Sequence, residues 1–313
     1  MIRLVVRRVA WAIVIAWFVV TATFVLVAAI PADPARALAG PHATAEELAR
    51  VRAAYCLDEG VLVRYGCYVG RVAHGDLGES YRTRRPVAEL LAAHAGPTAQ
   101  LALAALVLQL LFGVPLGVVA AVRRGRWPDA ASGLVGLIGA SAPTFVVGAV
   151  LAWLGAYRFG WFPIAGAGTG GVLDRLWHLT LPALTLAAAG TAYYARVVRG
   201  GLVEALAADH VRTARAKGLR ESRVVLRHGL RGALGPLVTL AGLDLGALLG
   251  GAVVTETIFA WPGLGRELLA ATLELDIPVI LGVTLVGALF VSVANLVADL
   301  VVLWLDPRAR EEW

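Results

Sequence analysis

Long apolar runs constrain this chain more than any other feature of its sequence. Six such runs recur along it, at residues 9–30, 97–122, 130–156, 179–200, 233–258 and 278–304. A helix of about 20 apolar residues crosses the ~30 Å hydrocarbon core of a bilayer, so each run is long enough to span it. The sequence therefore predicts an all-α integral membrane protein with about six transmembrane helices.

The composition supports lipid as the solvent of this chain. Hydrophobic residues make up 59% of the 313 residues, and charged residues only 16%. That is too much apolar surface for one water-soluble core. The net charge of +6 comes from arginines gathered between the apolar runs, which indicates membrane topology and not nucleic-acid binding.

The N-terminal run has two interpretations. Arg3, Arg7 and Arg8 precede it, and Ala37-Leu38-Ala39 resembles a cleavage site, as in a secretory signal. Its length of about 22 residues exceeds the apolar region of a signal peptide and favours a retained first span. The arginines then hold the N-terminus in the cytoplasm.

Residues 31–96 differ in composition from the rest of the chain. They are rich in proline, acidic residues and arginine, which predicts an extracytoplasmic segment between a first unit, residues 1–30, and a five-helix core, residues 97–313. Cys56 and Cys67 both fall in this segment, on the side of the membrane where disulfides persist, and are candidates for a disulfide.

Arginine bias orients the remaining loops. Arg123, Arg124 and Arg126 share one short loop, and a second arginine-rich stretch covers residues 196–231, whereas the loops on the other side hold few basic residues. Positively charged loops stay in the cytoplasm, so both termini are expected there.

The arginine-rich loop at about residues 201–232 carries the most informative pattern. Alanine and arginine favour a helix up to Lys217, Gly218 can adopt a left-handed helix cap, and Glu221 suits the first turn of a second helix. Taken alone, the loop could equally be an amphipathic helix pair held on anionic lipid.

Several motifs resemble those of binding-protein-dependent ABC importer permeases, in the dipeptide, oligopeptide and nickel branch. The family's cytoplasmic Glu-Ala-Ala-x3-Gly signature is represented by Arg212-Thr213-Ala214-x3-Gly218. The other matching strings are Asp209-His-Val-Arg-Thr-Ala-Arg-Ala-Lys-Gly218, Glu256-Thr-Ile-Phe-Ala-Trp-Pro-Gly-Leu-Gly265, Asp306-Pro-Arg308 and Gly75-Asp-Leu-Gly-Glu-Ser-Tyr81. The likeness covers essentially the whole chain.

This resemblance implies a multi-pass permease of a bacterial or archaeal cytoplasmic membrane that carries di- or oligopeptides and catalyses no reaction itself. The implied partners are a second homologous permease, two ATPase subunits or domains that bind ATP and Mg, an extracytoplasmic solute-binding protein and membrane lipid. The chain itself would hold no cofactor or metal. The residues implied to couple it to the ATPase are Glu204, Asp209, Arg212, Thr213, Ala214, Arg215, Ala216, Lys217 and Gly218.

Two departures from the family pattern bear on this interpretation. The usual Ile-x-Leu-Pro ending of the signature reads His228-Gly-Leu-Arg231, with proline only at Pro236. Asp244 occupies a position that is usually uncharged. Carboxylates are costly at membrane depth, about 3 kcal/mol on insertion scales, so Asp244 and Glu256 are candidates for lining the pathway or for structural pairing.

Three other functions are alternatives to peptide import. A permease for nickel chelates or other small solutes fits the same motifs. A secondary transporter would show charged relays and repeated broken helices, and an intramembrane enzyme would show a clustered nucleophile and base; neither pattern is clear. The sole lysine, Lys217, is in no phosphate-binding loop, so ATP hydrolysis would belong to another subunit.

Overall fold

A computed structural model describes residues 2–29, 35–36 and 43–305. The described residues form helices and no named strand, apart from one isolated bridge between Glu79 and Pro86. The helices are α1 (Ile2–Ala29), α3 (Ala45–Ala54), α4 (Val61–Ala73), α5 (Val87–Val122), α6 (Trp127–Ser141), α7 (Thr144–Leu151), η1 (Ala152–Arg158), α8 (Val172–Ala207), α9 (Asp209–Ala216), α10 (Glu221–Arg223), η2 (Val224–Gly229), α11 (Leu230–Gly251), α12 (Val253–Ile258), α13 (Leu264–Leu273) and α14 (Ile277–Leu305).

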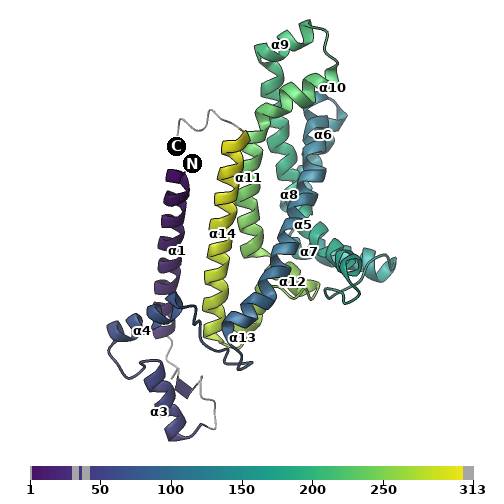
Figure 1. Ribbon diagram of the computed structural model, residues 1–313. Coiled ribbons are helices and arrows are strands. Elements are labelled where there is room, and N and C mark those ends of the chain that lie inside the picture. Colours follow the sequence, from purple (N-terminus) through teal and green to yellow (C-terminus); the bar gives the residue numbers. More distant parts are fainter. Residues whose placement is uncertain (1, 30–34, 37–42, 306–313) are drawn as a thin grey trace.

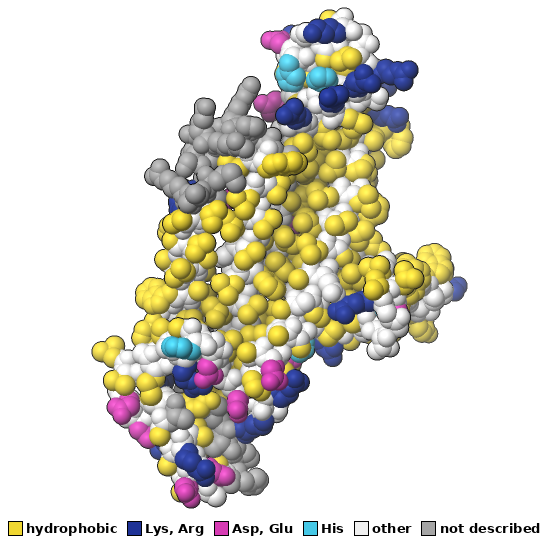
Figure 2. All heavy atoms as spheres, viewed as in Figure 1, with side chains coloured by type: hydrophobic (Ala, Val, Ile, Leu, Met, Phe, Trp, Pro, Cys, Tyr) yellow, Lys and Arg dark blue, Asp and Glu magenta, His cyan; other side chains and the backbone are white. Residues whose placement is uncertain are grey.

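The long helices form an upright bundle with a small unit at each end. In Figure 1, α3 and α4 lie at one end of the bundle and α9 and α10 at the other. Within it, α5 packs along α8 and α11 packs along α14, while α1 lies at the periphery against α14. Figure 2 shows apolar side chains covering the middle of the molecule and charged side chains gathered at its two ends. The surface is therefore that of a membrane protein, which confirms the predicted class.

Within the described residues, four helices are long and apolar enough to cross a membrane, at Val5–Leu26, Val87–Val122, Glu221–Leu249 and Ile277–Trp304. The pair Trp127–Gly139 and Thr144–Arg158 makes up to 5 if it counts as one span. Helix α8, which is 36 residues long and packs along α5, would be the remaining crossing. The count of six stays a prediction.

The third expected span, residues 130–156, is not one straight helix. Helix α6 ends at Ser141, α7 begins at Thr144, and the two are bent by 101°. Pro143 lies in the break. A proline lacks the amide hydrogen and disfavours the helical conformation of the residue before it, so Ala142 adopts an extended conformation and α6 stops.

Two other expected boundaries differ. Helix α5 begins at Val87, so the boundary placed at residue 96 falls inside a helix. The expected span at residues 233–258 divides into α11 and the short α12. The cleavage-like triplet at residues 37–39 and the Asp306-Pro-Arg308 motif lie outside the described residues.

Helix α1 is fixed at one point by a charge pair. The guanidinium Nε of Arg8 donates a hydrogen bond to the Asp299 carboxylate on α14 at 2.5 Å, and both side chains are at least two-thirds buried. An isolated charge at this depth would be costly, so each residue supplies the partner that the other needs.

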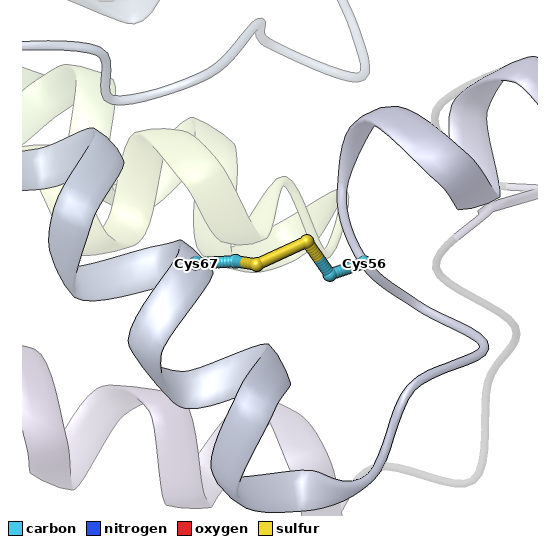
Figure 3. Close-up of a disulfide and its surroundings, with 2 residues drawn as sticks. All are labelled: Cys56 and Cys67. Carbon is cyan, nitrogen blue, oxygen red and sulfur yellow. A yellow bond between two sulfur atoms is a disulfide. The ribbon is translucent and has the colours of Figure 1, made fainter.

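The α3–α4 unit is closed by a disulfide. Figure 3 shows Cys67 on α4 joined to Cys56 in the turn after α3. Helix α3 begins with a capping box, in which the Thr44 hydroxyl accepts from the Glu47 amide and the Glu47 carboxylate accepts from the Thr44 amide. The unit therefore has local structure of its own outside the bundle.

We predict that this disulfide forms in the mature protein. A bond that closes so short a loop can contribute about 3 kcal/mol in the chain-entropy model. Unreduced protein should resist a thiol-alkylating reagent and should take up two labels after reduction. Labelling of both thiols without reduction would contradict the prediction.

Candidate coupling site and membrane pathway

The turn between α9 and α10 is a glycine-dependent helix end. Gly218 has φ of +72°, the left-handed conformation that its sequence context predicts. The Gly218 amide donates to the Arg215 carbonyl at 2.9 Å, and the Leu219 amide donates to the Ala214 carbonyl at 3.4 Å. These two bonds form a Schellman motif, which ends α9 and reverses the chain toward α10.

One face of this helix pair is buried against the rest of the chain. Val211 and Val224 are fully buried and Ala214 nearly so, and Leu206 and Leu219 pack around them. This small core joins α9, the turn and the start of η2 to the end of α8. The pair is therefore a rigid projection and not a loose loop.

The opposite face of α9 is exposed and charged. Of the candidate coupling residues, Ala214 is buried, whereas the others, Glu204, Asp209, Arg212, Thr213, Arg215, Ala216, Lys217 and Gly218, are exposed. Arg215 bonds both oxygens of Glu221, at 2.7 Å and 3.2 Å, and so connects α9 to α10. The Glu221 carboxylate raises the pKa of Arg215. The Arg215 guanidinium is thus paired with Glu221 inside the helix pair. Of these two basic side chains, Lys217 is the one more free to contact another protein.

A π-helical segment connects this projection to the bundle. In η2, Val225 packs with Leu202 of α8 and Ala121 of α5. A Cβ atom added to Gly229 would lie 2.7 Å from the Leu202 side chain, so the absence of a side chain allows the close approach. Segment η2 thus contacts α8 and α5 directly and continues into α11.

The Glu256–Gly265 motif forms a compact turn between α12 and α13. The Glu256 carboxylate is fully buried and accepts hydrogen bonds from the Thr98 hydroxyl at 2.7 Å and the Arg266 amide at 2.9 Å. A Cβ at Gly263 would overlap this carboxylate, which explains the glycine. Glu256 therefore fastens the turn to α5, and in this structure its position favours a structural role over pathway lining.

The chain matches two family descriptions that together cover nearly all of it. Residues 113–311 match the binding-protein-dependent transport system inner membrane component, and residues 1–102 match the N-terminal part of such membrane components. The chain belongs to this permease family.

Relatives and solved structures agree with this assignment. The permease is 42% identical over 281 residues to the glutathione transport system permease protein GsiC of Salmonella choleraesuis (strain SC-B67), which covers 90% of each chain. The corresponding protein of Escherichia coli (strain K12) is 41% identical with the same coverage. Two inward-facing structures of the MetNI methionine ABC transporter share the fold, with TM-scores of 0.55 and 0.58 and identities of 22% and 20%; each match covers 69% of this chain and 96% of the other.

The protein is accordingly a membrane-spanning ABC importer permease of the inner membrane, a transport subunit and not an enzyme. In such systems ATP is handled by separate ATPase subunits, and a binding protein delivers the solute.

Asp244 of the permease lies in a polar cluster inside the bundle. It is half-buried on α11, and the Tyr194 hydroxyl of α8 donates to its carboxylate at 3.2 Å. The amide of Gln109, a buried residue of α5, lies beside the same carboxylate. Asp244 and Glu256 are thus not brought together, and each belongs to a separate hydrogen-bonded group.

Asp276 is an anchoring residue that the sequence does not single out. Its side chain is buried and accepts hydrogen bonds from the Ser80 hydroxyl at 2.5 Å and from the Tyr81 and Arg82 amides at 3.1 Å and 3.2 Å. Asp276 immediately precedes α14 and Pro278, which is a helix-start pattern, but that pattern gives no sign of its partners 194 to 196 residues away.

Reversing the charge of Lys217 should weaken association with the partner ATPase several-fold at low salt. The side chain is exposed on the projecting face, and the loss should shrink as salt rises, because exposed charges are screened within about 10 Å at 0.1 M salt. Co-purification over a salt series measures it.

Arg215→Glu supplies the comparison, because it also places a carboxylate against Glu221. Adding Glu221→Arg to the same chain should recover part of the binding. If Lys217→Glu associates with the ATPase as well as the wild type does at low salt, the exposed face of α9 is not the ATPase-binding surface.

Proposed function

We propose that this permease forms the membrane pathway for di- and oligopeptides and that residues 201–232 couple the pathway to ATP hydrolysis in its partners. The observation that carries the coupling role is the α9–Gly218–α10 projection, which is rigid on one face, charged on the other, and extends beyond the apolar band (Figures 1 and 2). ATP-driven closure of the ATPase would move this projection, and η2 would transfer the movement to α8 and α11.

The relatives support a peptide substrate. They are named for glutathione transport, and glutathione is a short peptide, so a substrate of similar size and chemistry is the natural inference at 42% identity. The complex would contain a second homologous permease, two ATPase subunits that bind ATP and Mg, and a solute-binding protein. This chain would bind no cofactor.

The proposed orientation places both termini and the α9–α10 pair in the cytoplasm. It is supported by the arginines between α5 and α6 and around α9 and α10, because cytoplasmic loops carry the excess of basic residues. The α3–α4 unit then lies outside, where its disulfide would persist.

Reconstitution tests the substrate class. Liposomes containing both permeases and the ATPases should accumulate a labelled dipeptide when the binding protein and internal ATP are supplied. A labelled nickel chelate and a free amino acid serve as comparison substrates. Uptake of the chelate but not of the dipeptide would contradict the peptide assignment while leaving the coupling role intact.

Asp244→Asn should change the preference of the pathway for substrate charge. The asparagine preserves the shape and the Tyr194 contact, whereas the carboxylate charge is removed. If Asp244 faces the pathway, uptake of cationic peptides should fall relative to anionic peptides, measured with matched peptides carrying lysine or glutamate. An equal change for both peptides would indicate a structural role.

A further inference from the structure

A pocket of about 100 Å³ lies at the end of the bundle that carries α3 and α4. Helices α1, α4 and α14 line it, together with the turn after α3 and the segment after α4, which carries Tyr81. Helix α1 contributes Phe24, one face of α4 contributes Arg64, Tyr68 and Arg71, and the start of α14 contributes Leu281. The pocket thus lies where two candidate membrane spans meet the α3–α4 unit.

One wall of the pocket is apolar and at the membrane boundary. Phe24 is near the end of the span Val5–Leu26, and Leu281 is near the start of the span Ile277–Trp304. These apolar side chains would lie at the depth where acyl chains meet the headgroups, with Leu281 partly exposed and Phe24 8% exposed.

The other wall carries hydrogen-bond donors that the protein does not use. The Arg64 guanidinium stacks over the Phe24 ring at 5.4 Å and has no carboxylate partner among the described residues. Arg71, by contrast, is paired with Asp76 at 2.8 Å. The hydroxyls of Tyr68 and Tyr81 donate to no group in the described part of the chain.

These hydroxyls remain available as donors at any physiological pH. Burial raises the pKa of both tyrosines to about 12. The polar wall therefore offers one uncompensated positive charge and two neutral donors, a set that suits a phosphate oxygen.

We infer that this pocket binds one anionic phospholipid, with its phosphate at Arg64 and the tyrosine hydroxyls and an acyl chain along Phe24 and Leu281. The volume of about 100 Å³ is small, which suits a single headgroup phosphate beside Arg64. The lipid would connect α1, whose main contacts are with α14 and α4, to the α3–α4 unit.

Native mass spectrometry of the full-length protein tests this inference. Protein from zwitterionic nanodiscs doped with phosphatidylglycerol should retain one molecule of that lipid. Arg64→Gln should reduce retention about tenfold, the typical effect of losing a charge-assisted hydrogen bond. Arg50→Gln, which removes an exposed arginine of α3, is the matched control and should retain the lipid.

Other outcomes would overturn the inference. Equal retention by wild type and Arg64→Gln would do so, as would equal loss in both arginine variants, which would indicate general charge attraction. Competition by soluble glycerophosphoglycerol as strong as that by the lipid would indicate a phosphate site without an acyl contact. Leu281→Trp places a larger side chain in the pocket beside the apolar wall and should also abolish lipid retention. This variant tests the inference if Arg64→Gln does not fold, and full retention by Leu281→Trp would contradict it.

Discussion

Gly218→Val is expected to reduce substrate uptake at least tenfold while the protein remains inserted and assembled. Gly218 has φ of +72°, and a Cβ there would meet no atom within 4 Å, so the effect would come from the backbone alone. A β-branched residue in this conformation costs about 1–2 kcal/mol or forces the turn to rebuild. A rebuilt turn would misplace α9 relative to η2, and substrate-stimulated ATP hydrolysis should fall together with uptake.

Gly125→Val is the matched control for this prediction. Gly125 also has a left-handed φ, +76°, and open space around its Cα, but it lies between α5 and α6 and not in the coupling pair. It should carry the same backbone strain and leave coupling largely intact. Asparagine tolerates the left-handed region, so Gly218→Asn should retain most uptake. Wild-type uptake by Gly218→Val would show that this turn is not the coupling element.

Glu256→Ala is expected to destabilise the protein by about 3 kcal/mol or more. The change would leave the buried Thr98 hydroxyl and the Arg266 amide without an acceptor, at about 1–3 kcal/mol each. The measurement is the loss of monodisperse protein on heating in detergent. Glu256→Gln retains an oxygen acceptor and should lose less.

A double-mutant cycle separates this network from a simple loss of packing. The Thr98 hydroxyl also accepts from the Leu264 amide at 2.8 Å, so Thr98 and Glu256 act as one unit. Thr98→Val combined with Glu256→Ala should destabilise less than the sum of the two single changes. Additive losses would contradict the shared network.

The helix pair α9 and α10 was predictable because its signals are local. Gly218 follows a helix-forming stretch, and Glu221 begins the next helix, so helix, turn and helix can be inferred within a dozen residues of sequence. The apolar runs gave the long helices for the same reason. The resemblance to the permease family rested on these same strings, and the comparisons confirmed it.

Features that depend on distant contacts were not predictable. The Asp276 carboxylate is explained only by Ser80, Tyr81 and Arg82, which no spacing rule connects to it. Glu256 was a pathway candidate because a membrane carboxylate is unusual. The sequence could not show that the Thr98 hydroxyl donates a hydrogen bond to this carboxylate. Pro143, by contrast, was a local signal for the break between α6 and α7 that a simple search for apolar runs ignores.

The Arg8–Asp299 pair has a consequence for the order in which the chain is made. Its two residues are 291 positions apart and belong to the first and last helices. The ribosome makes Arg8 early and Asp299 near the end of synthesis. Arg8 is therefore at the edge of the membrane before the helices between them are inserted. Asp299 then enters a bilayer that already contains its counter-charge, which offsets a penalty of about 3 kcal/mol for an unpaired carboxylate. The first helix thus supplies the positive charge that the carboxylate of the last helix needs when it is inserted.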